Sequence, residues 1–169
     1  MTFNTIKITD TESTNTLLKQ MAAEGAEIGT TLVATRQSGG KGRLGRSFSS
    51  NEGGLYVSII LPYSENMSAG LLTTYAAIAV ARSIERLAPV KVDVKWVNDL
   101  LACGKKICGI LIENSIMGAN LSSAVVGVGI NINQTIGNYQ RSILTKMQKV
   151  MWRKKEWAEL ADLVQRRKK

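Results

Sequence analysis

The stretch from Arg36 to Ser50, RQSGGKGRLGRSFSS, most limits what this chain can fold into. Glycines alternate there with basic residues: the glycines are Gly39, Gly40, Gly42 and Gly45, and the cations are Lys41, Arg43 and Arg46. Glycine allows backbone N–H groups to approach an anion closely, and neighbouring cations neutralise its charge. The segment from Lys95 to Asn114 adds an Asn-Asp pair and lysines beside an apolar run. Together the two segments predict a phosphate-binding, nucleotide-dependent enzyme.

Two common nucleotide-binding folds do not fit this loop, although Gly40 to Gly45 reads literally as G-x-G-x-x-G. The dinucleotide fold needs a helix directly after the third glycine, but the polar stretch RSFSSNEGG and the strand-like run LYVSIIL follow instead. A P-loop needs Ser or Thr after its lysine, and Gly42 follows Lys41. An exposed, solvated basic loop is the alternative to a phosphate site.

Composition removes several classes of mechanism. The chain has 169 residues, 44% of them hydrophobic, which suits one domain with a sizeable core. It has no histidine and two cysteines, Cys103 and Cys108, so disulfides, a zinc site and imidazole catalysis are not expected. A reaction whose nucleophile is already an anion needs no such base. With no membrane-spanning run or signal peptide expected, we predict a cytoplasmic protein.

The net charge of +9 is concentrated near the end of the sequence. Residues 134–169 contain ten Lys or Arg and three Asp or Glu, whereas residues 1–133 contain twelve and ten. The spacing of apolar residues predicts a helical tail; these residues are Ile143, Met147, Met151, Leu160 and Leu163. This pattern favours an exposed amphipathic helix over a nucleic-acid contact, since only Trp152 and Trp157 accompany the basic run.

Hydrophobic patterns predict at least six strands and two core helices. The predicted strands are 3–9, 31–35, 55–61, 92–96, 106–113 and 123–132, and the predicted helices are 13–24 and 68–87. Ser13 or Thr14 suits the start of the first helix and Gly25 its end, while Pro89 ends the second. Because most strands come in pairs with short connections, we predict an α+β fold, a mixed sheet flanked by helices.

Five blocks of the sequence resemble, in order, the signature blocks of biotin protein ligases. They are ESTN at 12–15, GGKGRLGR at 39–46, KWVNDLL at 95–101, KKICGILIE at 105–113 and GVGININ at 127–133. The resemblance implies a class II aminoacyl-tRNA synthetase-like catalytic core in residues 1–133, followed by the basic tail at 134–169. It also implies that ATP, with Mg²⁺, activates biotin to biotinyl-5′-AMP, and that the biotinyl group passes to a lysine of a biotin carboxyl carrier domain.

The same resemblance implies roles for individual residues, with catalysis assigned to Lys106 and Arg43. The implied biotin-binding residues are Ser13, Thr14, Asn15, Gln37, Gly40, Lys41, Gly42, Arg43, Lys106 and Gly109. The implied ATP-binding residues are Lys41, Arg43, Arg46, Asn98, Asp99 and Asn131, and Asp99 is also the one candidate contact for Mg²⁺. The residues by themselves leave simpler roles open: an edge-strand lysine at 106, a helix cap at 13 or 14, and a turn at 98–99.

Some features depart from the family pattern. Phe48 stands where the family usually has Trp, Val97 where it has Pro, and Lys41 where it commonly has Arg. Lysine keeps the charge but loses the bidentate fork of arginine. Neither the family's small C-terminal barrel nor an N-terminal DNA-binding domain is expected, so a repressor role is not predicted. The alternatives are a lipoate or octanoate ligase, or a truncated biotin- or nucleotide-binding protein. Exposed sheet edges suggest a homodimer.

Overall fold

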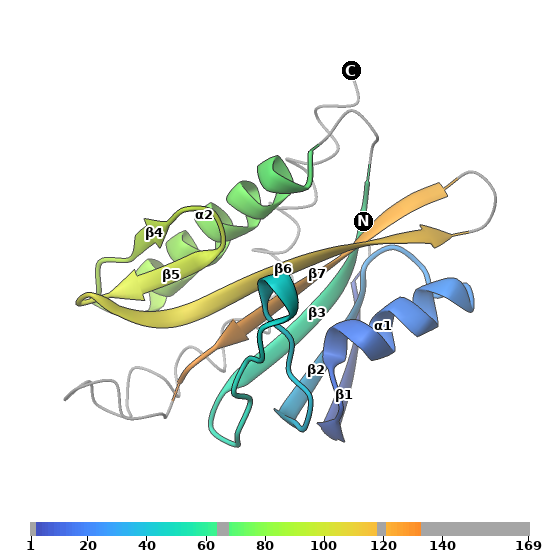
Figure 1. The fold of residues 1–169 in the computed structure, drawn as a ribbon, viewed down its shortest axis with the longest axis horizontal. Helices are drawn as coiled ribbons and strands as arrows, with labels where there is room; N and C mark the ends of the chain where they lie inside the picture. Colours follow the sequence, from blue (N-terminus) through green and yellow to red (C-terminus); the bar gives the residue numbers. More distant parts are fainter. Residues whose placement is uncertain (1–2, 64–67, 118–120, 133–169) are drawn as a thin grey trace.

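The computed structural model describes residues 3–63, 68–117 and 121–132, which form a seven-stranded sheet and two α-helices (Figure 1). The strands are β1 (Asn4–Thr11), β2 (Thr30–Gln37), β3 (Leu55–Pro62), β4 (Asp93–Lys95), β5 (Asp99–Ala102), β6 (Lys105–Met117) and β7 (Leu121–Ile130). The helices are α1 (Thr14–Ala23) and α2 (Ala69–Leu87), and a short 3-10 turn, η1, covers Arg43–Gly45. The predicted mixed sheet flanked by helices is confirmed.

The strand order is β1-β2-β3-β7-β6-β5-β4. Only β1 and β2 run parallel among these neighbours, and the other pairs are antiparallel. All eight residues of β3 are buried, as expected for a central strand with both faces covered. This explains why its sequence is a continuous apolar run rather than an alternating one.

The two helices cover opposite faces of the sheet. On α1, Leu18 and Ala22 pack with Leu32, Ile60 and Val125. The core under α2 uses the alternate positions of the same strands; it includes Leu72, Ala76, Val80 and Ile84 of the helix and Ile59, Leu61, Val126 and Val128 of the sheet. Since successive strand residues point to opposite faces, each helix has its own apolar surface. The face under α1 also carries the candidate site.

Local sequence signals explain how both helices begin. Ser13 caps α1, where its Oγ accepts a hydrogen bond from Thr16 N at 3.4 Å, and Ser68 caps α2 by accepting from Leu71 N at 3.2 Å. After α1, Gly25 takes a left-handed φ of 99°, which glycine adopts without strain.

Strand β5 was not predicted; its first residue, Asp99, belongs to the Asn-Asp pair for which a turn at 98–99 was the alternative. It placed the last strand at 123–132, whereas β7 covers Leu121–Ile130. The predicted helical tail at 134–169 lies outside the described residues. In the described part of the chain, no helix is long and apolar enough to cross a membrane.

Candidate functional site

A row of glycines forms the floor of the site, on the sheet face beneath α1. The strand register places Gly129 of β7 between Tyr56 of β3 and Gly109 of β6. Gly127 lies two residues earlier on β7, on the same face. A Cβ atom at Gly129 or Gly109 would come within 2.6 or 2.9 Å of the Phe48 ring. These positions therefore let an aromatic ring lie flat against the backbone, and no larger residue fits there while that ring stays in place.

The glycine-rich loop folds over this floor as a small hairpin. Lys41 and Ser47 form an isolated antiparallel bridge, and Phe48 N donates to Gly40 O at 2.8 Å. A Cβ at Gly40 would lie 2.4 Å from Phe48 O, so the close approach of the two loop arms requires glycine there. Leu44, at the tip, has a φ of 57° and is 87% exposed. The loop thus holds its cations beside the floor.

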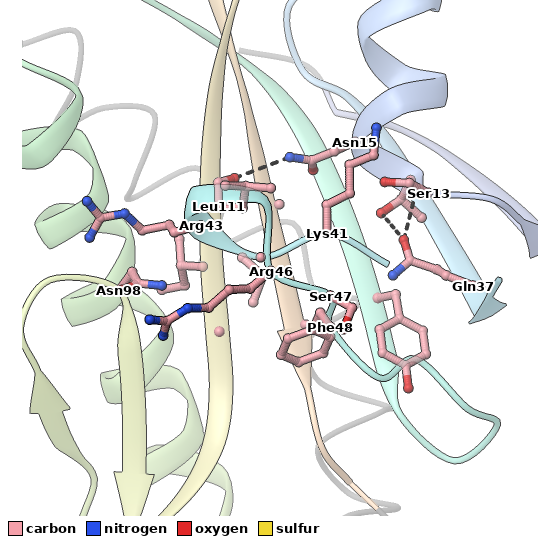
Figure 2. A pocket seen from close by; sticks show the side chains of 18 of the residues that line it. Ser13, Asn15, Gln37, Lys41, Arg43, Arg46, Ser47, Phe48, Asn98 and Leu111 are labelled. Atoms are coloured by element: carbon pink, nitrogen blue, oxygen red, sulfur yellow. Dashed lines mark hydrogen bonds between the residues drawn. The ribbon is translucent and has the colours of Figure 1, made fainter. Parts of the chain in front are cut away.

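Floor, loop and the start of α1 enclose a pocket of about 230 Å³ (Figure 2). Twelve residues predicted from the sequence line it: Ser13, Thr14, Asn15, Gln37, Lys41, Gly42, Arg43, Arg46, Asn98, Asp99, Lys106 and Gly109. In Figure 2, Ser13 and Gln37 lie at one end, and Arg43 and Asn98 lie at the other. Segments far apart in the sequence therefore meet around one cavity with two chemically different ends.

The first end is a buried network of neutral polar groups. Gln37 Oε1 accepts hydrogen bonds from the backbone N and the hydroxyl of Thr14, at 2.7 and 3.0 Å. Ser58 Oγ, which is fully buried, lies 2.7 Å from Thr14 Oγ1 and 2.6 Å from Asn15 Oδ1. Gln37 Nε2 in turn donates to Ser50 Oγ at 2.8 Å. This network presents oxygens and amides to one end of the pocket.

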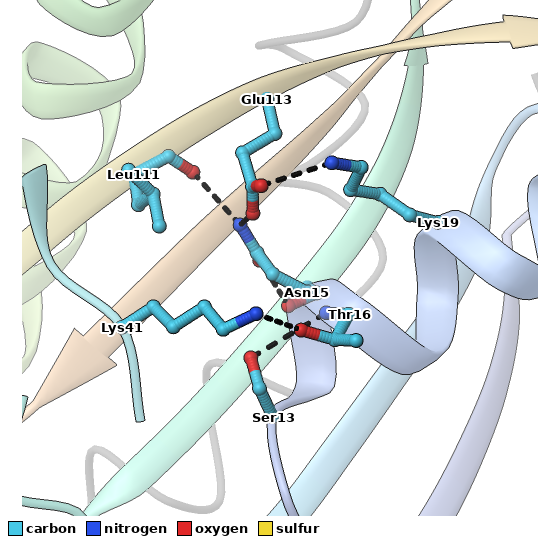
Figure 3. A network of polar contacts seen from close by, with 8 residues as sticks. Ser13, Asn15, Thr16, Lys19, Lys41, Leu111 and Glu113 are labelled. Atoms are coloured by element: carbon cyan, nitrogen blue, oxygen red, sulfur yellow. Dashed lines mark hydrogen bonds and ion pairs between the residues drawn. The ribbon is translucent and has the colours of Figure 1, made fainter. Parts of the chain in front are cut away.

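An ion pair lies behind this network, between α1 and β6 (Figure 3). Glu113 accepts hydrogen bonds from Asn15 Nδ2 at 2.9 Å and from Lys19 Nζ at 3.0 Å. Burial raises the pKa of Glu113, but the hydrogen bonds from Asn15 and Lys19 outweigh it, so the pKa lies below its ordinary value. Lys41 Nζ donates to Thr16 Oγ1 at 2.9 Å and so ties the loop to the first turn of α1.

The second end of the pocket is charged. Lys106 Nζ lies 2.8 Å from Asp99 Oδ1 and 5.7 Å from the centre of the Phe48 ring. Asp99 Oδ1 is buried and accepts no well-aligned hydrogen bond within the described chain, so this ion pair is its main contact. The ring of Phe48 also meets Tyr56 edge-on, with 6.5 Å between centroids. Lys106 is thus held above the floor, with the side chains of Arg43 and Arg46 also lining the pocket.

A family model described as the biotin/lipoate A/B protein ligase family matches residues 7–131. The chain belongs to this family. Among curated relatives, a bifunctional ligase/repressor BirA of Bacillus subtilis is 40% identical over 124 residues, which are 72% of this chain and 38% of the relative. A biotin--[acetyl-CoA-carboxylase] ligase of Mycobacterium tuberculosis is 35% identical over 134 residues, covering 75% of this chain and 48% of the relative. The chain therefore spans less than half the length of these two relatives.

Solved structures support the family membership. A biotin protein ligase from Aquifex aeolicus, in complex with biotin and ATP, has a TM-score of 0.69 and 30% identity, covering 86% of this chain and 69% of the other. A Leishmania major biotin protein ligase in complex with biotinyl-5-AMP has a TM-score of 0.69 at 22% identity, and this likeness concerns the fold.

Two of the residues expected from the family pattern do not line the pocket. Gly40 is buried beneath the loop, beside Gln37 and Ser50. Asn131 follows β7, where its Nδ2 donates to Lys106 O at 3.4 Å, so it contacts the backbone of the proposed catalytic lysine.

Some residues at the site were not predicted: Tyr56, Gly127 and Gly129, which line the pocket, and Ser58 and Glu113 of the polar network behind it. The signal for the floor was the block GVGININ, which contains Gly127 and Gly129. An alignment of the paired strands across the family would have shown that these glycines lie side by side with Gly109.

The described residues of this family member offer no ready-made metal cage and no reactive thiol at the site. They contain no group of three or more His, Cys, Asp or Glu side chains placed to hold a metal ion. Burial raises the pKa of the Cys108 thiol, which packs in the core and stays neutral. What the described residues bring to the pocket are cationic side chains, the Asp99 carboxylate and hydrogen-bonding groups.

Proposed function

We propose that this chain is a biotin protein ligase. In the proposed reaction it joins biotin and ATP to form biotinyl-5′-AMP, and then transfers the biotinyl group to a lysine of a biotin carboxyl carrier domain. The observation that carries this proposal is the pocket with a neutral, hydrogen-bonding end and a cationic end, joined by a flat glycine floor. The names of the relatives and the biotin and ATP bound to the Aquifex aeolicus structure support the same assignment.

Biotin fits this pocket in one direction. Its cyclic urea needs several hydrogen bonds, which Thr14, Asn15 and Gln37 are able to offer at the neutral end. Its ring system would lie against Phe48 and Asn15, whose side chains cover Gly129 and Gly127 closely because no Cβ atom raises the floor there. Its carboxylate then extends toward Lys106, whose ammonium neutralises it.

The first step needs little more than positioning and positive charge. An oxygen of the biotin carboxylate attacks the α-phosphorus of ATP, the bond from that phosphorus to the bridging oxygen breaks, and pyrophosphate leaves. Because the carboxylate is already ionised, a chain without histidine is sufficient. Lys106 and Arg43 stabilise the charge that develops on the phosphoryl oxygens. Arg46, Asn98 and Lys41 are the further nucleotide contacts that we propose.

Magnesium fits the site only as an ion carried by the nucleotide. Mg²⁺ is typically held by one or two carboxylates together with substrate phosphates and water. Asp99 supplies one carboxylate with a buried oxygen at the cationic end, and it is the residue we propose for this contact. When bound, the ion would neutralise phosphate charge beside Lys106.

The second step is aminolysis of a mixed anhydride. The neutral amine nitrogen of the carrier lysine attacks the biotinyl carbonyl carbon, the bond from that carbon to the phosphate oxygen breaks, AMP leaves, and the nitrogen releases one proton to solvent as the amide forms. The loop would cover the intermediate between the two steps and exclude water, which would otherwise hydrolyse it. A cytoplasmic location and a homodimer remain predictions.

Lipoate or octanoate ligation is the second candidate, since the family includes lipoate ligases. A lipoyl or octanoyl chain has no polar head group for Thr14, Asn15 and Gln37, whose hydrogen-bonding groups would stay unused. Isothermal titration calorimetry with biotin, lipoate and an oligonucleotide separates the candidates. We expect heat of binding with biotin alone. Binding of lipoate in preference to biotin would favour the second candidate, and binding only to the oligonucleotide would contradict both.

A further inference from the structure

The polar end of the pocket is a linear chain of four oxygens. In order, they are Asn15 Oδ1, Ser58 Oγ, Thr14 Oγ1 and Gln37 Oε1, with successive separations of 2.6, 2.7 and 3.0 Å. Ser58 is 0% exposed, and Thr14 and Asn15 are 4% and 5% exposed. Bulk water therefore does not reach the first three of these oxygens, whereas Gln37, at the pocket end, is half-buried. The direction of the hydrogen bonds in the row is set by its two ends.

The two oxygens at the ends of this row, Asn15 Oδ1 and Gln37 Oε1, accept hydrogen bonds and donate none. Gln37 turns Oε1 toward Thr14, because Thr14 N donates to that oxygen at 2.7 Å while Gln37 Nε2 donates to Ser50 Oγ. At the other end, Asn15 turns Nδ2 toward Glu113 Oε2 at 2.9 Å and Leu111 O at 3.4 Å, since a carboxylate and a carbonyl can only accept. Asn15 Oδ1 is thereby left facing Ser58.

This row of four oxygens has one hydroxyl proton fewer than it has oxygen–oxygen contacts. It has three oxygen–oxygen contacts, and the two hydroxyl groups between its ends carry one proton each. Ser58 donates to Asn15 Oδ1, so the Thr14 hydroxyl proton can reach either Ser58 or Gln37 but not both. When Thr14 donates to Ser58, Gln37 Oε1 keeps only the hydrogen bond from Thr14 N, so one of its lone pairs beside the pocket is free to accept. A ligand that brings an N–H group into the pocket fills this lone pair.

We propose that Glu113, held in place by Lys19, is a specificity-determining positioning residue that makes this end of the pocket select a head group with an N–H donor. Glu113 does not line the pocket and acts through Asn15 and Ser58. The inference rests on the proposed function, and it adds the reason for choosing a cyclic urea over a dithiolane ring, which has no N–H. A site built to hydrogen-bond such a group discriminates strongly against ligands that lack it.

The variant Glu113→Gln tests this role, because it changes few atoms and should reverse the direction of the hydrogen bond between residue 113 and Asn15. Lys19 Nζ can only donate, so it takes the Oε1 atom of the new amide. The amide nitrogen then faces Asn15. We expect Asn15 to turn its own oxygen toward it and its Nδ2 toward Ser58, because the bond from Nδ2 to Leu111 O that this gives up is long, at 3.4 Å. Three protons then serve three contacts, both lone pairs of Gln37 Oε1 are filled by Thr14, and the advantage of a ligand N–H is lost.

A double variant should restore the original direction of the hydrogen bonds between residue 113, Asn15 and Ser58. With Lys19→Met added to Glu113→Gln, no donor holds the oxygen of the new amide, which can rotate and accept from Asn15 Nδ2. Glu85→Gln is the matched control: Glu85 Oε1 accepts from Val92 N at 2.9 Å after α2, away from the pocket, and an amide oxygen can still accept there. Circular dichroism and thermal unfolding are the controls that test whether each variant is folded.

The measurement is the dissociation constant for biotin, desthiobiotin and lipoate, by calorimetry on the full chain. We expect Glu113→Gln to weaken biotin and desthiobiotin, which both carry ureido N–H groups, by about tenfold, on the scale of one net hydrogen bond. Lipoate should change by less than about twofold, since no hydrogen bond of this kind is lost. The double variant should regain most of the biotin affinity, and Glu85→Gln should match the parent.

The outcomes separate this inference from the proposed function. A parent chain that binds biotin, with a Glu113→Gln variant that loses affinity for all three ligands alike or for none, would overturn the inference alone. A double variant that binds biotin no better than Glu113→Gln would do the same. A parent chain that does not bind biotin would overturn the proposed function and this inference with it.

Discussion

A substitution in the glycine floor should change biotin binding while leaving the stability of the fold almost unchanged. In Gly129→Ala, the added methyl group would lie 2.6 Å from the nearest atom of the Phe48 ring, so the ring must move. The backbone of Gly129 lies outside the left-handed region, so alanine fits its conformation. Phe48 is half-buried on a loop and can shift without opening a cavity in the core.

The expected change in the free energy of unfolding is small. Replacing a strand glycine by alanine contributes about 0.5–1 kcal/mol of stability. Displacing Phe48 weakens its edge-on contact with Tyr56 and its contact with Lys106, which are worth about 0.5–1.5 and 0.5–1 kcal/mol. These effects oppose each other, so we expect the unfolding free energy to stay within about 1 kcal/mol of the parent value. The displaced Phe48 ring, in contrast, would overpack bound biotin by about 1–3 kcal/mol, which corresponds to a loss of affinity of about fivefold to 150-fold.

Urea unfolding and calorimetry with biotin measure the two effects on the same samples. Gly70→Ala in α2 is the matched control, since among the described residues the nearest atom to its added methyl group outside the helix backbone is Ser68 Oγ at 4.0 Å. We expect this control to bind biotin as the parent does. If Gly129→Ala is folded and also keeps the parent's affinity, biotin does not lie against Phe48 above the glycine floor and the proposed orientation is wrong.

Four further predictions follow from the site. Lys106→Ala should lower the rate of biotinyl-adenylate formation by about a hundredfold or more, as for removal of other preorganised donors, and a rate near the parent's would refute its catalytic role. Arg43→Gly should still form the adenylate but lose about 1.5–3 kcal/mol of contact with it, so biotin should appear on bystander proteins by streptavidin blot; no extra labelling would argue against Arg43 as the clasp. Hydrogen exchange across residues 38–51 should slow when biotin binds, and unchanged exchange would count against a closing loop. Because the pKa of Glu113 is lowered in the fold, its contribution to stability is complete above the unfolded carboxyl pKa of about 4.3 and is lost as the pH falls through the lower folded value. The difference in unfolding free energy between the parent and Glu113→Gln should therefore narrow in acid, and a pH-independent difference would contradict the assigned hydrogen bonds.

Local signals in the sequence predicted much of the fold. Ser13 and Gly25 begin and end α1 because a side-chain oxygen and a left-handed φ meet needs that arise within a few residues. Strand β5 was missed because Asp99–Ala102 follows Asn98, and an Asn-Asp pair is as typical of a turn as of a strand end. The structure has both: residues 96–98 form a turn and Asp99 begins the strand.

The floor and the polar chain could not be predicted, because both depend on strand register. Gly109 and Gly129 become neighbours only when β6 and β7 pair as they do, and a shift of one residue would turn them to the other face. Ser58 lies in an apolar run, and nothing in that run indicates that its side chain faces Thr14 and Asn15 rather than the core under α2. The loop cations and Lys106 were easier to find, because family blocks mark them directly.

The central claim is tested most directly by mass spectrometry of a mixture of the chain, biotin and Mg-ATP. We predict that biotinyl-5′-AMP accumulates together with pyrophosphate, and that lipoate in place of biotin gives little or no lipoyl-AMP. A folded chain that binds biotin and nucleotide but forms no biotinyl-5′-AMP would contradict the proposed ligase activity, and preferential formation of lipoyl-AMP would assign the chain to the other branch of the family.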